Sequence, residues 1–491
     1  MSRSSYDCIP YPSYSHRLTH PEWLRSIGWI HGVNTPDPKR AKILEIGCAT
    51  GENILPIAGY YPECSVVGID PSEIQINRAI DSARRLKLKN ISFDTQLRKE
   101  LLELRTWDYI ICHGVFSWVS TDVQNQILSD CKELLTSNGL VLISYNARPG
   151  WNLRGTLRHL LLLSSSRTDP PYTQIQNARA LLNSLESLPA LESTLSLHWL
   201  GDELKRLKSL PDAYLFHEYL EEHNHPYYFS EFVEKVQGVG FRYLSDADMT
   251  ADSLAHLANL PMQGSYGNFD YLKSIQLLDV IANRTFRQSV ICHSEIPSPS
   301  TLPRRKLSEV YLFGNFRIQH DAESYASIVT QRGNSIRSNN VYFNSILQHL
   351  ACRYPASTHF QELVDLMCSL TKNSAVHKVE DWLNTMLSNL IAQGDLQISL
   401  SEDLFASQFS STLRIHPYVV RCAQNGFSIT NPRHETILLN EETMRFIKLR
   451  GEGLKVFQYE NAKQFESLSA CKEQTDRSFL QDLMKYCLLF N

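Results

Sequence analysis

Residues 45–51, EIGCATG, combine a carboxylate with two glycines directly after an apolar run. Gly47 and Gly51 let the backbone pass close to a ligand at the carboxyl edge of a sheet, where α/β proteins bind cofactors. A dinucleotide-binding turn would have a third glycine where this chain has Ala49. Glu45 would repel a pyrophosphate but suits a cationic amino-acid group. The turn therefore predicts a cofactor with a positive charge; a turn without a ligand and a nicotinamide or flavin site are the alternatives.

Acidic residues at the ends of the next two predicted strands extend this candidate site. Asp70 ends the segment 65–70, where an acidic side chain can accept hydrogen bonds from both ribose hydroxyls. Asp94 ends the segment 90–94 and could meet an adenine amino group. The predicted cofactor-binding residues are Glu45, Gly47, Cys48, Gly51, Asn53, Asp70, Pro71, Asp94 and His113.

Aromatic residues follow the fourth and fifth predicted strands, in the segments HGVFSWV at 113–119 and SYNARPGW at 144–151. Aromatic faces attract cations, and aromatic walls exclude water and hold an acceptor in line for attack. A hydroxyl and an amide oxygen beside them can accept hydrogen bonds and fix the direction of an amine. The predicted acceptor-site residues are Tyr145, Asn146, Trp118, Phe116 and Trp151.

Each of these assignments has a structural alternative. Phe116, Trp118 and Trp151 could serve only to pack a neighbouring segment onto the sheet. We expect His113 to line the cofactor rather than to act as a base. The His217–Glu218 pair could orient groups at the site, but such a pair more often lies on a packed or solvated helix face, so neither residue is placed in the catalytic set.

Strands alternate with helices through the first third of the chain. Apolar runs predict strands at residues 42–46, 65–70, 90–94, 109–112 and 140–145. Ser72 can cap the second helix, which is expected to bury Ile74, Ile76, Ala79, Ile80, Ala83 and Leu86. A later helix is expected to end near the turn at 137–139. Alternating β and α units imply an α/β fold, with a Rossmann-like parallel sheet and helices on both faces.

The rest of the chain divides into further predicted regions. Residues 1–150 form the cofactor-binding core, 151–228 a helical insertion that faces the substrate, and 229–295 the last strands of the sheet, at 241–244 and 287–292. A Pro- and Ser-rich linker at 296–303 leads to residues 304–405, whose three helices and following strand predict a winged-helix-like α+β region. Residues 406–491 are expected to form an extension that packs on it.

Composition narrows the functional classes. The 48 basic and 52 acidic residues give a net charge of −4, which argues against a nucleic-acid partner. The amino-terminal residues lack the apolar core of a signal peptide, and the aliphatic run at 160–163 is too short for membrane insertion. The 11 cysteines form no CxxC pair, so we expect reduced thiols, a cytoplasmic location and no metal site.

Taken together, these segments resemble a known family, and the resemblance covers essentially the whole chain. The segments are the glycine turn, HGVFSWV, SYNARPGW, FHEYL at 216–220, NRTFRQ at 283–288 and TNPRHE at 430–435, with Tyr6, Asp7, Pro10 and Tyr11 near the start. The chain resembles class I S-adenosylmethionine-dependent methyltransferases with a methyltransferase regulatory domain, and in particular the rickettsial lysine methyltransferases that modify outer-membrane protein.

The resemblance implies a methyltransferase core, a middle domain and a carboxy-terminal winged-helix region. It also implies S-adenosyl-L-methionine as the cofactor and bacterial protein lysine methylation as the activity. The implied partner is a protein substrate, such as an outer-membrane or surface protein before export; a homodimer is left open. The alternatives are a small-molecule methyltransferase and a non-catalytic binding or regulatory protein with the same fold. The intact Glu45, Gly47, Gly51 and Asp70 argue against the last.

Overall fold

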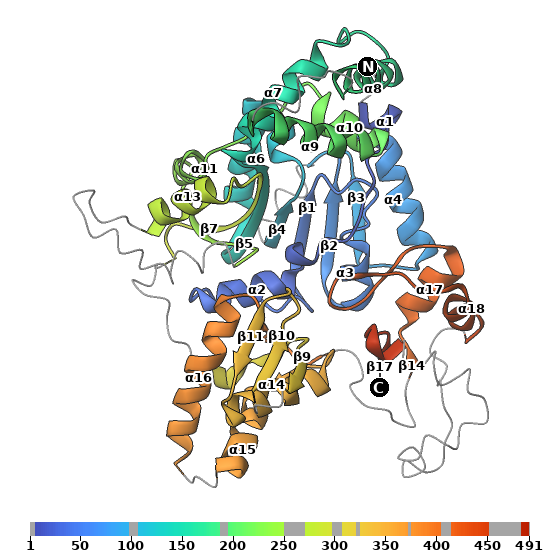
Figure 1. Cartoon of the computed structure of the whole chain (residues 1–491). Coiled ribbons are helices and arrows are strands. Elements are labelled where there is room, and N and C mark those ends of the chain that lie inside the picture. The colour runs from blue at the N-terminus through green and yellow to red at the C-terminus, as the bar shows by residue number, and fades with distance from the viewer. Residues whose placement is uncertain are drawn as a thin grey trace.

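The computed structural model describes residues 5–97, 107–186, 195–249, 271–296, 307–320, 325–371, 375–403, 414–450 and 483–490. Its centre is a seven-stranded sheet in the order β3-β2-β1-β4-β5-β7-β6 (Figure 1). The first five strands are parallel and β7 is antiparallel to both of its neighbours. The strands are β1 Lys42–Ile46, β2 Ser65–Ile69, β3 Ile91–Asp94, β4 Trp107–Cys112, β5 Leu135–Asn146, β6 Phe241–Asp246 and β7 Phe286–His293. The predicted α/β class with a Rossmann-like sheet is confirmed.

Side chains alternate between the two faces of the sheet and feed two hydrophobic clusters. In β4, Tyr109 and Ile111 face one cluster, whereas Ile110 and Cys112 face the other. The second cluster includes residues of α6 and α11. The helices associated with the sheet are α2 Pro21–Ile30, α3 Leu55–Tyr60, α4 Glu73–Arg85, α6 Thr121–Leu134, α11 Phe229–Gln237 and α13 Tyr271–Ile281.

Helix α4 begins where Ser72 predicted it, because the Ser72 Oγ accepts the Gln75 backbone N–H at 3.2 Å. Its buried stripe is narrower than expected. Ile74 and Ile80 are 40% and 46% exposed, so their predicted burial is wrong. Both lie outside the face that the remaining apolar residues of this helix share.

Strand β5 begins earlier than predicted, at Leu135 rather than residue 140. The expected turn at 137–139 is part of the strand instead. Leu135 pairs with Trp107, and the register then shifts before Tyr109 pairs with Leu140. This irregularity accommodates the glycine and the polar residues that resembled a turn.

Helices α7 Gly150–Leu162, α8 Pro171–Glu186, α9 Leu195–Ser209 and α10 Asp212–Tyr219 follow β5 and precede α11. They share a hydrophobic cluster of their own, which also takes in Ile9 from the start of the chain. Together with the short helix α1, Ser5–Cys8, they lie across one end of the sheet (Figure 1). That end carries the residues that follow β2, β4 and β5.

The carboxy-terminal α+β region contains the three helices and the final strand that the sequence predicted: α14 Val341–Arg353, α15 Phe360–Thr371, α16 Val376–Ala392 and β13 Gln397–Ser399. Strand β8, Tyr311–Phe313, is the middle strand of a small sheet and pairs with β13 on one side and with β12, Thr358–His359, on the other. A second sheet contains β9 Arg317–His320, β10 Ala326–Val329 and β11 Ser335–Ser338. The assignment of this region as winged-helix-like stays a prediction. Most of the predicted linker at 296–303 lies outside the described residues.

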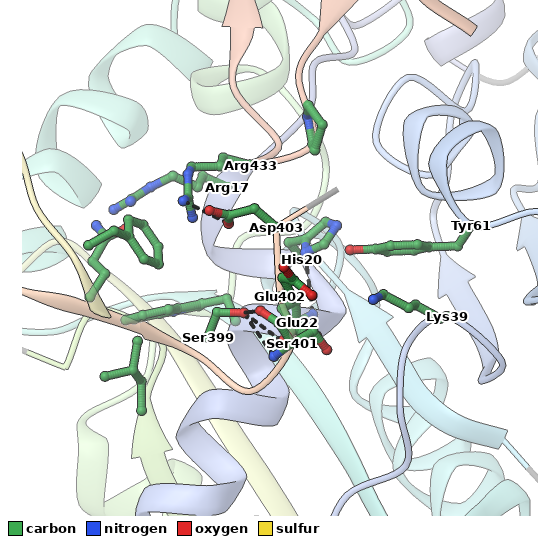
Figure 2. A pocket seen from close by; sticks show the side chains of 15 residues that line it. Arg17, His20, Glu22, Lys39, Tyr61, Ser399, Ser401, Glu402, Asp403 and Arg433 are labelled. Atoms are coloured by element: carbon green, nitrogen blue, oxygen red, sulfur yellow. Dashed lines mark hydrogen bonds and ion pairs between the residues drawn. The ribbon is translucent and has the colours of Figure 1, made fainter. Parts of the chain in front are cut away.

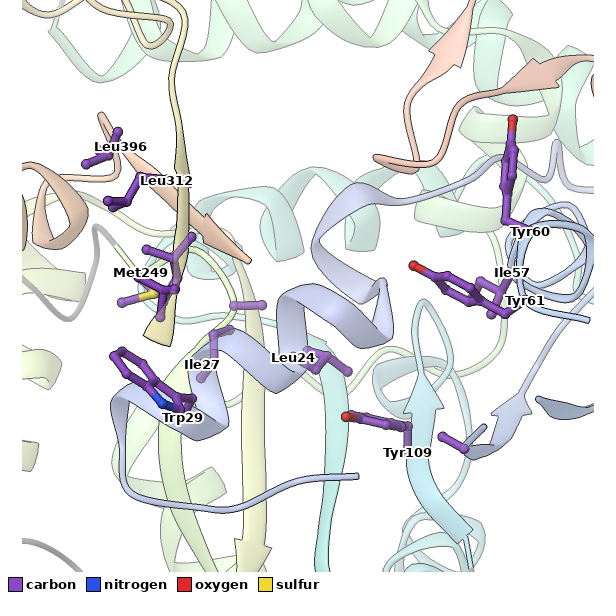
Figure 3. Close-up of a cluster of buried hydrophobic side chains, with 14 of the residues drawn as sticks. Leu24, Ile27, Trp29, Ile57, Tyr60, Tyr61, Tyr109, Met249, Leu312 and Leu396 are labelled. Carbon is purple, nitrogen blue, oxygen red and sulfur yellow. The ribbon is translucent and has the colours of Figure 1, made fainter. Parts of the chain in front are cut away.

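Helix α2 connects this α+β region to the sheet. Leu24, Ile27 and Trp29 of α2 lie between Tyr109 of β4 and Leu312 of β8 in one continuous cluster (Figure 3). The Ser26 Oγ also donates to the Ile398 carbonyl at 3.1 Å. The two regions therefore share a hydrophobic core.

The last part of the chain returns to the seven-stranded sheet and its helices. It contains β14 Arg414–Ile415, α17 Pro417–Asn425, β15 Ile429–Thr430, β16 Thr436–Ile437, α18 Glu441–Arg450 and β17 Leu489–Phe490. Helix α17 packs on α3, and the Tyr60 hydroxyl donates to the Thr430 carbonyl at 2.7 Å (Figure 1). Arg433 also contacts Asp403 at 3.1 Å, so this part touches both the core and the α+β region.

Within the described ranges, no helix has both the length and the apolar character needed to cross a membrane. The cysteines of these ranges are unpaired, and most of them are buried.

Candidate functional site

The glycine turn is shaped by steric contacts that require glycine. Gly47 has φ +77°, and a Cβ there would lie 2.2 Å from the Val115 side chain. Gly51 has φ +81°, and a Cβ there would lie 2.9 Å from the Phe93 ring. The backbone N–H groups of Gly47 and Cys48 both donate to the Ile69 carbonyl, at 2.7 and 3.0 Å. The turn therefore folds tightly over the end of β2, and the predicted close approach of its backbone to a ligand stays a prediction.

Glu45 is buried at the end of β1 with only half of its carboxylate satisfied. Oε1 accepts the Asn53 Nδ2–H at 2.7 Å, whereas Oε2 is buried and has no hydrogen-bond partner among the described residues. Burial raises the pKa of this carboxyl to about 8, and nearby Asp70 acts in the same direction. An orphan carboxylate oxygen is costly to bury, and an ammonium group would relieve that cost. The site thus fits a cofactor that carries a cationic amino group.

Asp70 lies at the end of β2 and closes the other side of the turn. Its two carboxylate oxygens accept the Ala49 and Ser72 backbone N–H groups, each at 3.0 Å. Each oxygen keeps a further lone pair for a ribose hydroxyl. Burial raises the pKa of Asp70. The Ser72 Oγ also donates to Asp7 at 2.5 Å, which brings the start of the chain to this edge.

The remaining predicted cofactor residues lie around this turn. Cys48 is buried so close to Gly68 that a Cβ on the glycine would lie 2.7 Å from the Cys48 sulfur. Pro71 is exposed. Asp94 pairs in register with Ile69 at the same sheet edge, and its carboxylate accepts the Thr95 backbone N–H at 2.8 Å. Its contact with adenine stays a prediction.

His113 follows β4 and is half-buried, with two aromatic rings beside it. The His16 ring lies 4.2 Å from it and the Phe286 ring 5.9 Å, measured between centroids. Burial and the neighbouring His16 lower the pKa of His113 to about 3. A neutral imidazole with so low a pKa is a poor proton acceptor near pH 7. The low pKa argues against a role of His113 as a base, and its place beside the cofactor stays a prediction.

Asn146 ends β5 with its side-chain oxygen available. Its backbone N–H donates to the Ser117 Oγ at 2.9 Å, and its Nδ2 donates to Asn224 Oδ1 at 3.2 Å. Its backbone carbonyl accepts the Tyr227 N–H at 2.9 Å. No described residue donates to Asn146 Oδ1. The backbone contacts hold Asn146 in place, and its side-chain oxygen is left for another molecule.

Trp118, Trp151 and Tyr219 form an aromatic corner, contributed by the short helix η2 Phe116–Trp118, α7 and α10; η2 lies at the end of β5, where Ser117 Oγ accepts the Asn146 N–H. The indole rings of Trp118 and Trp151 meet edge to face at 6.0 Å. Trp151 is buried and lies 5.9 Å from the Tyr219 ring, whereas Trp118 is half-buried. Tyr219 belongs to this corner but was not among the predicted site residues. Its one sequence signal is its place in the segment FHEYL at 216–220.

Phe116 and Tyr145 point into the hydrophobic core instead. Phe116 is 0% exposed and meets the Phe232 ring edge to face at 6.0 Å. Tyr145 stacks on the same Phe232 ring at 4.1 Å, and its hydroxyl lies 3.2 Å from Ser289 Oγ. Because strand side chains alternate, Tyr145 shares the face of Ile143 and Asn146 does not. This geometry assigns both rings to side-chain packing rather than to the acceptor wall.

His217 clamps the start of the chain to α10. Nδ1 lies 2.8 Å from Glu221 Oε1 and Nε2 lies 2.6 Å from the Ile9 carbonyl. The Tyr6 ring stacks on the imidazole at 4.4 Å. Glu218 is half-buried, and burial raises its pKa. Both ring nitrogens of His217 are engaged in holding the segment, so we keep it outside the catalytic set.

Residues near the start of the chain complete the site without any sequence signal. Asn53 Oδ1 accepts the His16 backbone N–H at 2.8 Å, and Asn53 Nδ2 donates to the Thr19 hydroxyl oxygen at 3.0 Å. The Thr19 hydroxyl in turn donates to the His16 carbonyl at 2.8 Å. Neither His16 nor Thr19 belongs to a recognisable motif, so the sequence did not mark them.

A separate pocket lies between α2 and the carboxy-terminal region (Figure 2). Tyr61 and Lys39 lie on the side opposite Arg17 and Arg433. Its lining includes neither Glu45 nor Asn146, so it is distinct from the cofactor turn.

Comparison with known proteins agrees with this geometry. A methyltransferase domain family matches residues 44–141, and the family described as "Predicted methyltransferase regulatory domain" matches residues 211–293. The uncharacterized protein RP028 of Rickettsia prowazekii is 37% identical over 244 residues, covering 50% of this chain and 98% of that protein. RP789 of the same organism is 35% identical over 292 residues, covering 59% of this chain and 53% of that protein. The chain thus spans about half the length of RP789.

A solved structure resembles the whole chain. PKMT2 from Rickettsia typhi in complex with AdoHcy superposes with a TM-score of 0.81 and 26% identity, covering 98% of this chain and 100% of that one. The cofactor of the present protein is accordingly S-adenosylmethionine, whose amino group suits the half-satisfied Glu45. The chain belongs to the class I S-adenosylmethionine-dependent methyltransferases that carry a methyltransferase regulatory domain.

Proposed function

We propose that this protein transfers methyl groups to lysine side chains of a protein substrate. The observation that carries the proposal is the similarity to PKMT2 of Rickettsia typhi, because it extends through the carboxy-terminal region as well as the catalytic core. The unsatisfied oxygen of Asn146 beside an aromatic corner supports an amine acceptor. By the family resemblance, the substrate would be an outer-membrane or surface protein that is methylated in the cytoplasm before export.

Four of this chain's residues would hold the cofactor. Glu45 would pair with the amino group through its unsatisfied oxygen, and Asp70 would accept hydrogen bonds from the ribose hydroxyls. Asp94 would contact the adenine, and His113 would line the methionine end. S-adenosylmethionine, when bound there, supplies an electrophilic methyl group.

The acceptor amine must be neutral before it can attack. A free lysine has a pKa of about 10.4. An apolar environment and a nearby positive charge both lower the pKa of an amine, and the corner formed by Trp118 and Trp151 provides the first. Asn146 Oδ1 would accept a hydrogen bond from the amine and so direct its lone pair. His113 is too weak a base to take the proton, so the proton would leave to water.

Labelling with S-adenosylmethionine carrying an isotopic methyl group tests the acceptor class. The purified protein is incubated with the labelled cofactor and a fractionated bacterial lysate. Label in the protein fraction supports the proposal, whereas label confined to small molecules would overturn it. A parallel AdoHcy titration tests the alternative that the protein keeps the fold without the activity. Absence of saturable binding at micromolar concentration would contradict any methyltransferase function.

A further inference from the structure

Asn53 joins three parts of the chain that are distant in sequence. Its Oδ1 accepts hydrogen bonds from the His16 backbone N–H and the His434 ring, each at 2.8 Å, and its Nδ2 donates to the Thr19 hydroxyl oxygen at 3.0 Å. Its Nδ2 also donates to Glu45 Oε1 at 2.7 Å. A backbone N–H can only donate, so the atom that faces His16 must be the amide oxygen. This contact identifies which atom of the amide is the oxygen, so Nδ2 is the atom that faces Glu45.

His434 reaches this point from the far end of the chain, 381 residues away. It is buried in the turn between β15 and β16 and has φ +63°, a left-handed conformation that is uncommon for a residue other than glycine. Asn431 Oδ1 accepts the backbone N–H groups of Arg433 and Glu435, each at 3.0 Å, and so holds the turn in shape. The hydrogen bond from Tyr60 to Thr430 fastens the same turn to α3.

The bond to Asn53 determines which nitrogen of His434 carries the proton. Asn53 Oδ1 can only accept, so Nε2 must donate. Burial lowers the pKa of His434 well below its usual range, and the neighbouring His20 and His16 act in the same direction. The imidazole is therefore neutral at physiological pH, with its proton on Nε2.

Asn53 provides the single described hydrogen bond to the Glu45 carboxylate. The direction of the unsatisfied Oε2 thus depends on how firmly Asn53 is held. We propose that His434 is a positioning residue of the cofactor site: the β15–β16 turn, residues 429–437, orients Asn53 and through it Glu45. Full cofactor affinity then requires the carboxy-terminal part of the chain to be docked on the core. The inference rests on the proposed pairing of Glu45 with the cofactor's amino group.

Removing the His434 donor should weaken cofactor binding without abolishing it. The His16 and Thr19 contacts remain, so the loss is that of about one hydrogen bond, or roughly a three- to tenfold increase in the AdoHcy Kd. His434→Ala and His434→Leu are both measured by calorimetry on the full chain, since the leucine variant keeps most of the side-chain volume if the alanine variant fails to fold. His434→Gln retains a donor and should restore most of the affinity.

The matched control is Thr436→Ala. Thr436 lies in the same turn, and its hydroxyl contacts Ser15 at 2.8 Å rather than Asn53. Its removal should leave the AdoHcy Kd unchanged. Wild-type affinity in folded His434→Ala or His434→Leu, or an equal loss in Thr436→Ala, would overturn the proposal.

A double-mutant cycle with Glu45→Gln separates positioning from general support of the fold. If His434 acts through Glu45, its replacement should cost little further affinity once the carboxylate is gone. Additive losses would overturn the positioning role. Wild-type affinity in Glu45→Gln alone would instead contradict the proposed cofactor contact, so the two failures are distinguishable.

Discussion

The proposed cofactor and acceptor contacts are made by single residues at the carboxyl ends of β1, β2 and β5. Most of these residues can be proposed from the sequence, because glycines and carboxylates after apolar runs have few structural uses. The sequence placed Tyr145 and Phe116 on the wrong side of their segments for the acceptor site. Both are aromatic residues next to site residues, and only the strand alternation and the pairing with Phe232 distinguish them from Asn146 and Trp118.

Cofactor affinity should rise with pH between about 6 and 8. Glu45 without cofactor has a pKa near 8, so it is mostly protonated below that pH, whereas pairing with an ammonium requires the carboxylate. Binding therefore releases a proton, and affinity should increase by up to about tenfold per pH unit before levelling above pH 8. Two titratable neighbours of Glu45, Cys48 and Cys112, stay neutral because burial raises their pKa values. Asp70 is therefore the neighbour whose charge influences the titration of Glu45.

Calorimetry with AdoHcy in buffers of different ionisation enthalpy checks this prediction by counting the protons released. Glu45→Gln should bind more weakly and show a flat pH profile. A flat profile for the wild-type protein would contradict the assignment of Glu45.

Gly47→Ala should disrupt the turn through a steric clash. The new Cβ would lie 2.2 Å from Val115, in a left-handed conformation that itself costs a residue other than glycine about 1–2 kcal/mol. The matched control is Gly114→Ala, because Gly114 has φ +74° and open space around it. We expect Gly47→Ala to lose clearly more unfolding free energy and AdoHcy affinity than Gly114→Ala in denaturant titrations. Equal losses in the two variants would mean that the left-handed backbone conformation, and not the clash with Val115, accounts for the effect of Gly47→Ala.

Asn146→Ala and Trp118→Ala should lower turnover at least tenfold while changing AdoHcy affinity by less than about threefold. Both residues face the acceptor rather than the cofactor in this account. Tyr145→Phe is the control, since its hydroxyl contacts only Ser289 among the described residues. It should stay close to wild-type turnover. Steady-state kinetics measure the turnover, and titration measures the AdoHcy affinity. A large loss of turnover in Tyr145→Phe would mean that the Tyr145 hydroxyl takes part in the acceptor site.

At the scale of elements, regular patterns were predicted well and irregular segments were not. The strands of the sheet and the Ser72 cap followed from apolar runs and a hydroxyl at the right spacing. The early start of β5 did not, because a pairing irregularity absorbs a glycine that otherwise resembles a turn. Residues 9–20 carry no periodic signal, yet they line the cofactor edge through long-range contacts with Asn53 and His217.

Helix α2 offers a test of the shared core. Ile27 is fully buried in the cluster that joins β4 to β8. Ile27→Ala should lower the free energy of unfolding by about 2–5 kcal/mol, as is typical of a large-to-small change in a packed core. Ile80→Ala is the control, because Ile80 is largely exposed on α4 and should change stability by less than about 1 kcal/mol. Similar losses in both variants would contradict the continuous core.

At the scale of the whole molecule, the carboxy-terminal part completes the catalytic core from a distance. The sequence predicted an extension that packs on the α+β region, and α17 additionally packs against α3 behind the glycine turn. No local pattern could reveal this, because the contacts join residues several hundred positions apart. The family resemblance drew attention to His434, but only the folded chain brings it to Asn53.

The most direct test of the central claim is the identity of the methylated amino acid. Protein from the labelling reaction is hydrolysed completely and its labelled amino acids are identified by mass spectrometry, with the Asn146→Ala variant as a comparison. Methylated lysine, reduced in the variant, is the predicted result. Label in another amino acid, or in none, would contradict the account of this protein as a lysine methyltransferase.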